Sequence, residues 1–155
     1  MPNHVKNILE FAGSETEILK LKETIGGYNE EENIDMEIDF ERIIPMPQDA
    51  DWFHWRVDNW GTKWNAYEQE ETIGNKMIFN TAWCPPTPVI GKLATMFPKL
   101  KITHRWASED IGYCCGKRVY QNGVIKTERP KADGSPKDVA YAKKIWREAG
   151  DDCWS

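Results

Sequence analysis

Residues 5–27 read VKNILEFAGSETEILKLKETIGG and contain the strand-then-helix step that decides the fold. The strand is marked by the apolar residues Val5, Ile8, Leu9 and Phe11. Ser14 with Glu17 three residues later forms a capping box, which predicts that a helix opens here. Its apolar residues Ile18, Leu21 and Ile25 fall on one face. Gly26 and Gly27 then end the helix, because glycine accepts the left-handed turn that closes a helix.

The rest of the chain divides into further elements with clear local signals. Residues 34–41 alternate apolar and acidic side chains, which predicts a strand with one buried face. Residues 77–83 predict a third strand, and a second helix begins at Thr87-Pro88 and stops before Pro98. A fourth strand follows Leu100, with Ile102, His104 and Trp106 on one face. Asn122-Gly123 predicts a tight hairpin, and a last helix starts at Ser135-Pro136.

This order of elements predicts a single α+β domain over residues 1–155, a ferredoxin-like split βαβ sandwich. Crossovers of one hand place both helices on one face of a four-stranded antiparallel sheet. A tryptophan-rich insertion occupies about residues 48–74, and an added β-hairpin with a C-terminal helix occupies about residues 112–150. The hairpin and the last helix are candidates to cover the opposite face of the sheet.

The net charge of −5 conceals two halves of opposite sign. Residues 1–74 hold 17 acidic and 6 basic side chains, whereas residues 75–147 hold 14 basic and 5 acidic ones. A folded sheet mixes these halves, so we expect cross-strand pairs to neutralise them. The alternative is an exposed basic face for nucleic-acid phosphates, built from Lys101, Arg105, Lys117 and Arg118.

The cysteines predict free thiols in a reducing compartment. Cys84, Cys114, Cys115 and Cys153 show none of the two-residue gaps of zinc or redox motifs. The start of the chain lacks a basic stretch followed by an apolar run, and about 18 consecutive apolar residues occur nowhere. We therefore expect a cytoplasmic protein with no membrane partner and no cofactor.

Four of the eight tryptophans stand between Trp52 and Trp64. An indole combines a large apolar face with one polar N–H, so such a cluster favours either a structural plug over the sheet, a protein-binding surface or a ligand pocket. The candidate binding residues are Asn59, Trp60, Gly61, Thr62, Lys63, Trp64 and Asn65, together with Trp83, Arg105 and Trp106.

Two weaker constellations carry titratable side chains. Asp51, His54 and Asp58 share one helix face and could hold a metal, although a solvated face explains them as well. His104 with Glu109 and Asp110 could supply general acid–base chemistry near one strand end. The chain has no nucleophile elbow, dinucleotide fingerprint or phosphate-cradling loop. We therefore predict no catalytic residues and no metal site.

Several strings resemble the YubB-type ferredoxin-like family of plasmid and phage or prophage proteins. The strings are Pro2-Asn3-His4-Val5, Ile43-Ile44-Pro45-Met46-Pro47, Asn59-Trp60-Gly61-Thr62-Lys63-Trp64-Asn65-Ala66, Thr81-Ala82-Trp83-Cys84-Pro85-Pro86-Thr87-Pro88, and Trp106-Ala107-Ser108-Glu109-Asp110 running into Gly112-Tyr113-Cys114-Cys115-Gly116. The resemblance implies a ferredoxin-like sandwich without an iron–sulfur cluster, a mobile-element origin and no established activity. Cys114 departs from the family, which more often has a polar residue there.

From these observations we predict a small non-catalytic binding protein for a host or mobile-element protein, with Trp60 to Trp64 as its hot spot. A nucleic-acid-binding module that uses the basic stretch is the alternative. A small-molecule- or metal-dependent enzyme is the second alternative. The mobile-element kinship and the lack of catalytic motifs are the grounds for this order.

Overall fold

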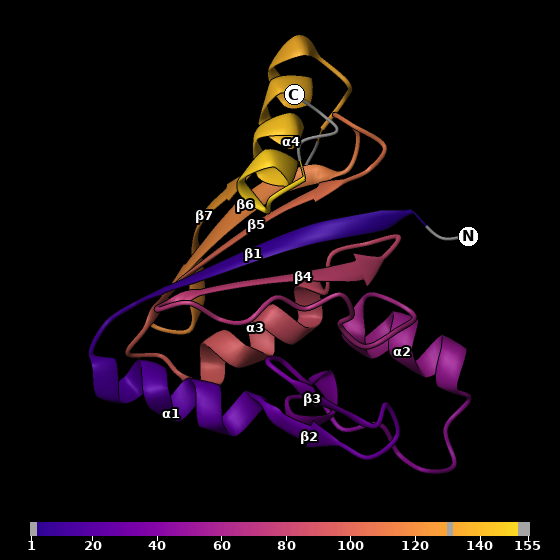
Figure 1. The fold of residues 1–155 in the computed structure, drawn as a ribbon, viewed down its shortest axis with the longest axis vertical. Helices are drawn as coiled ribbons and strands as arrows, with labels where there is room; N and C mark the ends of the chain where they lie inside the picture. The colour runs from indigo at the N-terminus through magenta and orange to yellow at the C-terminus, as the bar shows by residue number, and fades with distance from the viewer. Residues whose placement is uncertain (1–2, 130–131, 152–155) are drawn as a thin grey trace.

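The computed structural model describes residues 3–129 and 132–151. Its main sheet is antiparallel, with the five strands in the order β4-β1-β5-β6-β7 (Figure 1). The strands are β1 (His4–Ala12), β4 (Lys76–Ala82), β5 (Lys101–Ser108), β6 (Cys115–Gln121) and β7 (Val124–Arg129). The placement of β1 between β4 and β5 is the arrangement expected when two split βαβ units interleave. The predicted ferredoxin-like fold is therefore confirmed.

Strand β1 is buried on both faces of the sheet. Ile8 lies opposite Ile78 of β4 on one side and opposite Arg105 of β5 on the other. Leu9 points into one apolar cluster and Ile8 into a second cluster on the opposite face. The strand therefore carries apolar side chains in succession, as in a sheet that is covered on both sides.

Three helices and the larger core lie on one side of the sheet. They are α1 (Glu15–Ile25), α2 (Trp52–Trp60) and α3 (Thr87–Met96). Ser14 is the N-cap of α1 as predicted, because its Oγ accepts a hydrogen bond of 3.2 Å from the backbone N–H of Glu17. Leu21 and Ile25 of α1 and Leu93 of α3 are fully buried in this core.

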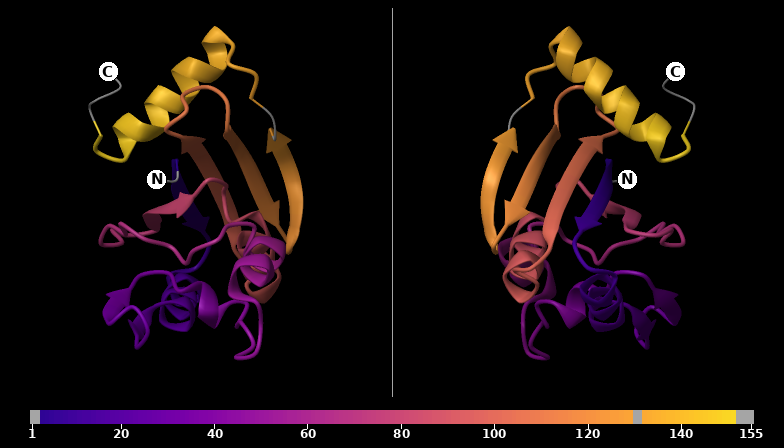
Figure 2. Two further views of the ribbon diagram at one scale, coloured as in Figure 1. Left: turned by 90° about the vertical axis from the view of Figure 1, so that its right-hand side faces the viewer. Right: turned by 90° about the vertical axis from the view of Figure 1, so that its left-hand side faces the viewer.

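Helix α4 (Pro136–Glu148) covers the other face of the sheet (Figure 2). Its N-cap Ser135 accepts a hydrogen bond from the N–H of Asp138 at 3.3 Å. A second apolar cluster lies beneath it, comprising Ile8, Ala107, Cys115, Ala142, Ile145 and Trp146. The hairpin β6–β7 extends the sheet through a tight turn in which Asn122 and Gly123 have φ of 54° and 79°. The hairpin and the last helix form where the sequence predicts, but only the helix covers the opposite face, because the hairpin extends the sheet.

The predicted strand over residues 34–41 is mostly wrong. Only β3 (Ile34–Met36) is extended, it pairs with β2 (Gly27–Asn29) outside the main sheet, and a short 3₁₀ helix, η1, covers Phe40–Arg42. The side chain of Gln69 accepts hydrogen bonds from the N–H groups of Glu37 and Ile38, at 2.8 and 2.9 Å. A side chain therefore occupies the backbone donors that a neighbouring strand would need.

The outer edge of β4 is bordered by a different segment. Tyr67 exchanges two backbone hydrogen bonds with Asn80, and the N–H of Glu70 donates to the carbonyl of Ile78 at 3.0 Å. The predicted alternation describes burial only in part. Met36, Ile38 and Phe40 are buried as expected, but Ile34 is half-exposed and Asp39 is buried.

No helix within residues 3–129 and 132–151 is long and apolar enough to cross a membrane. Cys84, Cys114 and Cys115 carry free thiols. The fourth cysteine, Cys153, lies outside the described residues.

Gly116 in β6 provides a test of how tightly the sheet packs. A Cβ at this position would lie 2.5 Å from Cζ2 of Trp106 and closer still to the carbonyl oxygen of Arg129. Gly116→Ala is therefore expected to lower the free energy of unfolding by about 2 kcal/mol, because the indole and a backbone strand must both shift. Urea denaturation measures the change.

Gly91→Ala is the matched control. Gly91 lies inside α3, and a Cβ added there would meet no atom within 4 Å. The alanine should therefore raise the free energy of unfolding by about 0.5–1 kcal/mol through its better helix propensity. Equal stability of the two variants would contradict the tight packing at Gly116.

Candidate functional site

The tryptophan-rich segment turns sharply where α2 ends. Gly61 has φ of 78°, a left-handed conformation that glycine adopts without strain. A Cβ on Gly61 would lie 2.7 Å from Cδ of Pro88, so the chain also passes close to the start of α3. The glycine in the predicted binding string thus has a structural role, which is to let α2 pack beside α3.

Trp60 belongs to the core and not to a contact surface. Its side chain is fully buried, and its Nε1–H donates to the carbonyl oxygen of Ile44 at 2.8 Å. Phe40 and Trp55 pack edge-on against its ring. Thr62 is also buried and donates through Oγ1 to the carbonyl of Ala82 at 2.7 Å. The expectation of Trp60 as a hot spot is corrected accordingly, because a fully enclosed indole cannot touch a partner.

Asn65 joins three parts of the chain from a buried position. Its Oδ1 accepts from the N–H of Phe40 at 3.0 Å and from the N–H of Ala66 at 2.9 Å, and its Nδ2 donates to Oδ1 of Asp39 at 2.9 Å. Asn59 makes a single hydrogen bond, from Nδ2 to the carbonyl of Trp55. Both amides therefore hold the insertion in place, Asn65 far more than Asn59.

The other half of the segment is at the surface, around the ammonium group of Lys63. Its Nζ lies 3.9 Å from the ring centroid of Trp83 and 4.4 Å from that of Trp64. The side chain of Trp83 is 46% exposed and that of Trp64 is 37% exposed, so both rings are accessible to a partner. A cation over two ring faces is held by the negative charge of the π-systems. Lys63 forms no ion pair with any residue that the structure describes.

Trp83 is held in an unusual backbone conformation. Its φ is 67°, in the left-handed region that a bulky side chain rarely occupies, and its N–H donates to the carbonyl of Asn3 at 2.9 Å. Such strain persists only where the surrounding structure imposes it, and it is concentrated at functional sites.

Two further aromatic residues extend this surface. The ring of Phe53 lies 6.5 Å from that of Trp83, and Trp52, which is exposed, lies 5.8 Å from Phe53. We call the surface of Trp52, Phe53, Lys63, Trp64 and Trp83 the aromatic–lysine face. The sequence-based site omits Trp52 and Phe53, although they belong to the same tryptophan cluster.

Trp106 and Arg105 lie away from the aromatic–lysine face. Trp106 is buried, and the guanidinium of Arg118 stacks 4.7 Å above its ring centroid. Arg105 forms ion pairs with Glu148 of α4 at 2.6 Å and with Glu10 of β1 at 2.5 Å. The structure thus brings together Lys63, Trp64 and Trp83 of the predicted site, and separates Arg105 and Trp106 from them.

The predicted basic stretch is partly neutralised within the protein. Arg105 has two carboxylate partners, and Arg118 pairs with Glu128 at 2.8 Å. Lys101 and Lys117 are exposed and form no ion pair among the described residues. The expected neutralisation across strands therefore operates for the two arginines.

His104 is sealed inside the sheet. Its Nε2 lies 2.9 Å from Oδ1 of Asn7, and burial lowers the pKa of His104 to about 3. Glu109 instead accepts a hydrogen bond from the N–H of His4, at the end of the sheet. His104, Glu109 and Asp110 therefore do not form an acid–base group, because a neutral, enclosed imidazole reaches neither substrate nor solvent.

Asp51 and His54 form an exposed pair on α2, with Nδ1 and Oδ2 2.6 Å apart. The hydrogen bond to Asp51 raises the pKa of His54. Among the described residues, no group of three or more His, Cys, Asp or Glu side chains is arranged to hold a metal ion.

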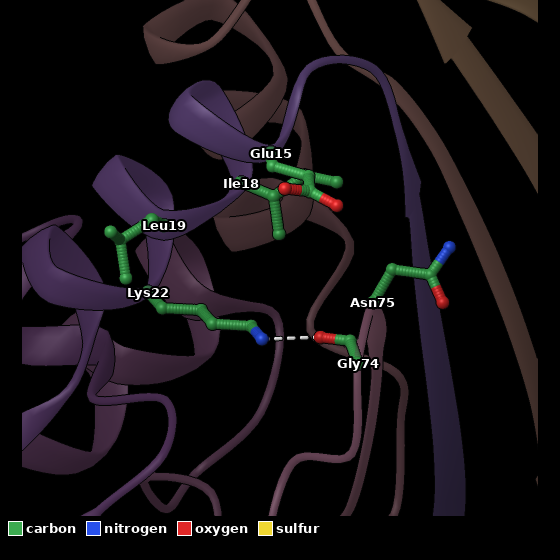
Figure 3. A pocket seen from close by; sticks show the side chains of 6 residues that line it. All are labelled: Glu15, Ile18, Leu19, Lys22, Gly74 and Asn75. Carbon is green, nitrogen blue, oxygen red and sulfur yellow. Dashed lines mark hydrogen bonds between the residues drawn. The ribbon is translucent and has the colours of Figure 1, made fainter.

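A shallow hollow of about 430 Å³ lies apart from all these residues, between α1 and the turn before β4 (Figure 3). Ile18 and Leu19 provide its apolar wall. Lys22 crosses it to donate to the carbonyl of Gly74. Lys22 and Asn75 in its wall already donate to the backbone carbonyls of Gly74 and Phe11, so the aromatic–lysine face is the stronger candidate.

Comparison with known proteins agrees with the fold. The family model described as "Ferredoxin-like domain in Api92-like protein" matches residues 59–146, more than half of the chain. The crystal structure of a protein api92 from Yersinia pseudotuberculosis is 17% identical, with a TM-score of 0.49 over 63% of this chain and 40% of that chain. This chain therefore spans less than half the length of that protein. The search of curated proteins found no match.

Asn65→Ala tests the structural role of the string. The variant should lower the free energy of unfolding by about 3 kcal/mol, because it leaves two backbone N–H groups without an acceptor and removes one of the donors to the buried carboxylate of Asp39. Asn59→Ala, the control, removes one half-buried hydrogen bond and should cost less than about 1 kcal/mol. Chemical denaturation measures both losses of unfolding free energy. Equal losses in the two variants would show that Asn65 does not join the insertion to the segment of Asp39 and Phe40.

Glu148→Gln tests the pairing of Arg105. Arg105 and Lys76 hold the pKa of Glu148 at about 2, below its usual 4.5. Because the folded pKa is the lower one, this stabilisation is present above about pH 4.5 and is lost as the pH falls toward 2. The variant should lose about 1 kcal/mol near pH 7, a value reduced by solvent screening of the half-exposed pair. Chemical denaturation at a series of pH values measures the free energy of unfolding of the parent and of the variant. The difference between them should shrink as the pH falls toward 2, and a difference that stays constant would contradict the pairing.

Proposed function

The chain belongs to the family of ferredoxin-like domains in Api92-like proteins, and from that premise we propose that it is a non-catalytic protein-binding module. Its contact surface is the aromatic–lysine face. The partner presents a carboxylate flanked by apolar side chains. The observation that carries the proposal is the ammonium of Lys63, held between the exposed rings of Trp64 and Trp83.

The chemistry of the partner follows from what the face lacks. Lys63 has two aromatic neighbours and no carboxylate partner among the described residues, so its charge is available to an incoming acid. The indoles exclude water on both sides of the ammonium and strengthen such a pair. Trp52 adds exposed apolar area that a partner would bury. Together these features fit an acidic residue within an apolar segment.

The face is also ordered before binding. The ammonium of Lys63 stacks on the ring of Trp83, which restricts both side chains before association. The hydrogen bond from the backbone N–H of Trp83 to the carbonyl of Asn3 fixes the backbone that carries this ring. Ordering in advance reduces the entropic cost of binding. Strain at Trp83 is consistent with this role, because the residue keeps a costly conformation at an exposed position.

A mobile-element setting is part of the proposal. The resemblance of the Asn-Trp-Gly-Thr-Lys-Trp string to the YubB-type family supports an origin on a plasmid or phage. The free thiols of Cys84, Cys114 and Cys115 support the cytoplasm of a bacterial host as the location. In that setting the module would act as an effector on a host or mobile-element protein.

Catalysis has less support from the geometry. Burial raises the pKa of Cys114 to about 11, so this thiol is not an activated nucleophile. His104 is enclosed and neutral. The two residue types most often used as nucleophile and base therefore lack the environment that catalysis requires at these positions.

Trp83→Asn is the variant that tests the face. Asparagine accepts the left-handed backbone, so the free energy of unfolding should stay within about 1 kcal/mol of the parent while the indole is lost. Photo-crosslinking from position 52, followed by mass spectrometry, identifies the partner. Trp83→Asn and Lys63→Glu should each weaken its binding by about tenfold or more. Lys20→Glu, an exposed change on α1, is the control and should bind as the parent does.

A charge swap then tests the chemistry. Lysine in place of the crosslinked partner's acidic residue should restore binding to Lys63→Glu and weaken binding to the parent. Undiminished binding by a folded Trp83→Asn variant would overturn the proposal. Loss of binding in Lys20→Glu alone would move the contact surface to α1.

A further inference from the structure

A cavity of about 530 Å³ opens where β1 ends and β5 begins, far in sequence from the aromatic–lysine face. Lys99 lines it from the loop before β5, Lys101 from the start of β5 and Lys126 from β7. The amide side chains of Gln121 and Asn122 complete its polar wall. Lysine ammonium and amide N–H groups are all hydrogen-bond donors, so the cavity is lined for an acceptor-rich ligand.

The charge of this cavity is not compensated within the protein. No carboxylate lines it, and none of the three lysines forms an ion pair among the described residues. The arginines Arg105, Arg118 and Arg129, by contrast, each have a carboxylate partner. The cavity therefore brings together three lysines that no carboxylate neutralises, in a chain of net charge −5.

The frame that carries the lysines is held by close packing. Lys101 lies opposite Ala12 in the register of β1 and β5, and Leu100 between Lys99 and Lys101 is buried. A Cβ on Gly13 would lie 2.5 Å from Cδ2 of Leu100, so the end of β1 passes directly against this segment. The backbone positions of Lys99 and Lys101 are therefore fixed, and their flexible side chains line the cavity.

The tip of the β6–β7 hairpin is fixed against α3 in the same region. A Cβ on Gly123 would lie 3.6 Å from the carbonyl oxygen of Ala94 and 3.9 Å from Cβ of Pro98. This contact sets the start of β7, and hence Lys126, beside the loop that carries Lys99.

We propose that this cavity binds a phosphate-bearing ligand. Several ammonium groups around one space favour a multiply charged anion, whose charge they share and whose oxygens accept from both ammonium and amide donors. The size of the cavity admits one or a few phosphate groups and not a folded partner. The site lies apart from the aromatic–lysine face, so the inference stands or fails independently of the proposed function.

The test uses inorganic tripolyphosphate and a short single-stranded oligonucleotide as probes, with calorimetry on the full chain at about 50 mM salt, where electrostatic binding is strong. Each probe should bind saturably, and binding should weaken steeply as salt rises. Replacing Lys99, Lys101 and Lys126 together with Gln should weaken it by about tenfold or more, whereas replacing the same three with Arg should retain it.

A triple change of Lys20, Lys92 and Lys137 to Gln is the matched control, because these exposed lysines lie outside the cavity and the net charge changes equally. Equal weakening in the control, or no binding of either probe to the parent, overturns the proposal. An oligonucleotide that binds much more tightly than tripolyphosphate identifies a nucleic-acid backbone as the source of the phosphates. Equal affinities identify a free phosphate compound, and both results support the site.

Discussion

Burial of β1 on both of its faces is the constraint on which the rest of this structure depends. The strand pairs with β4 and β5 and places side chains alternately into the core of α1 and α3 and into the smaller core beneath α4. Asn7 stands in its middle, fully buried, and bonds to Thr81 of β4 while lying within hydrogen-bonding distance of His104 of β5. A single polar side chain thus joins three strands, and burial keeps the imidazole beside it neutral.

The charges of the two halves of the chain meet across the same strand. Glu10 of β1 and Glu148 of α4 both bind Arg105, and Glu148 also binds Lys76 of β4. This network secures α4 to the sheet at the edge of the smaller apolar core. Arg105, Arg118 and Arg129 are paired with carboxylates, whereas Lys99, Lys101 and Lys126 form no ion pair among the described residues. A compact, mobile ammonium group suits a solvated anion more than a rigid ion pair.

The tryptophan-rich insertion combines two roles within a few residues. Trp60, Thr62 and Asn65 are bonded inside the protein, and the intervening Lys63 and Trp64 are held at the surface. The buried members therefore agree with the hypothesis of a structural plug, and the exposed members form the proposed contact surface. The buried members support the exposed ones, since the left-handed turn at Gly61 and the hydrogen bonds of Asn65 set the path from which Lys63 projects toward Trp83. Rigid support of this kind is what a binding surface needs for specificity.

The sequence by itself determined those features whose physical cause lies within a few residues. These are the caps at Ser14 and Ser135, the Asn122-Gly123 turn and the apolar periodicities. The order of these elements along the chain in turn indicated the ferredoxin-like fold. Only the tertiary structure decided the rest. Residues 34–41 carry a strand pattern, yet Gln69 occupies their backbone donors and a different segment borders β4. Trp60 and Trp64 belong to one short string with no local signal to tell them apart, and only packing against Phe40 and the core separates them. Lys126 joins Lys99 and Lys101 at one cavity only after β5 and the hairpin meet, because this approach of distant side chains depends on contacts that no local pattern encodes.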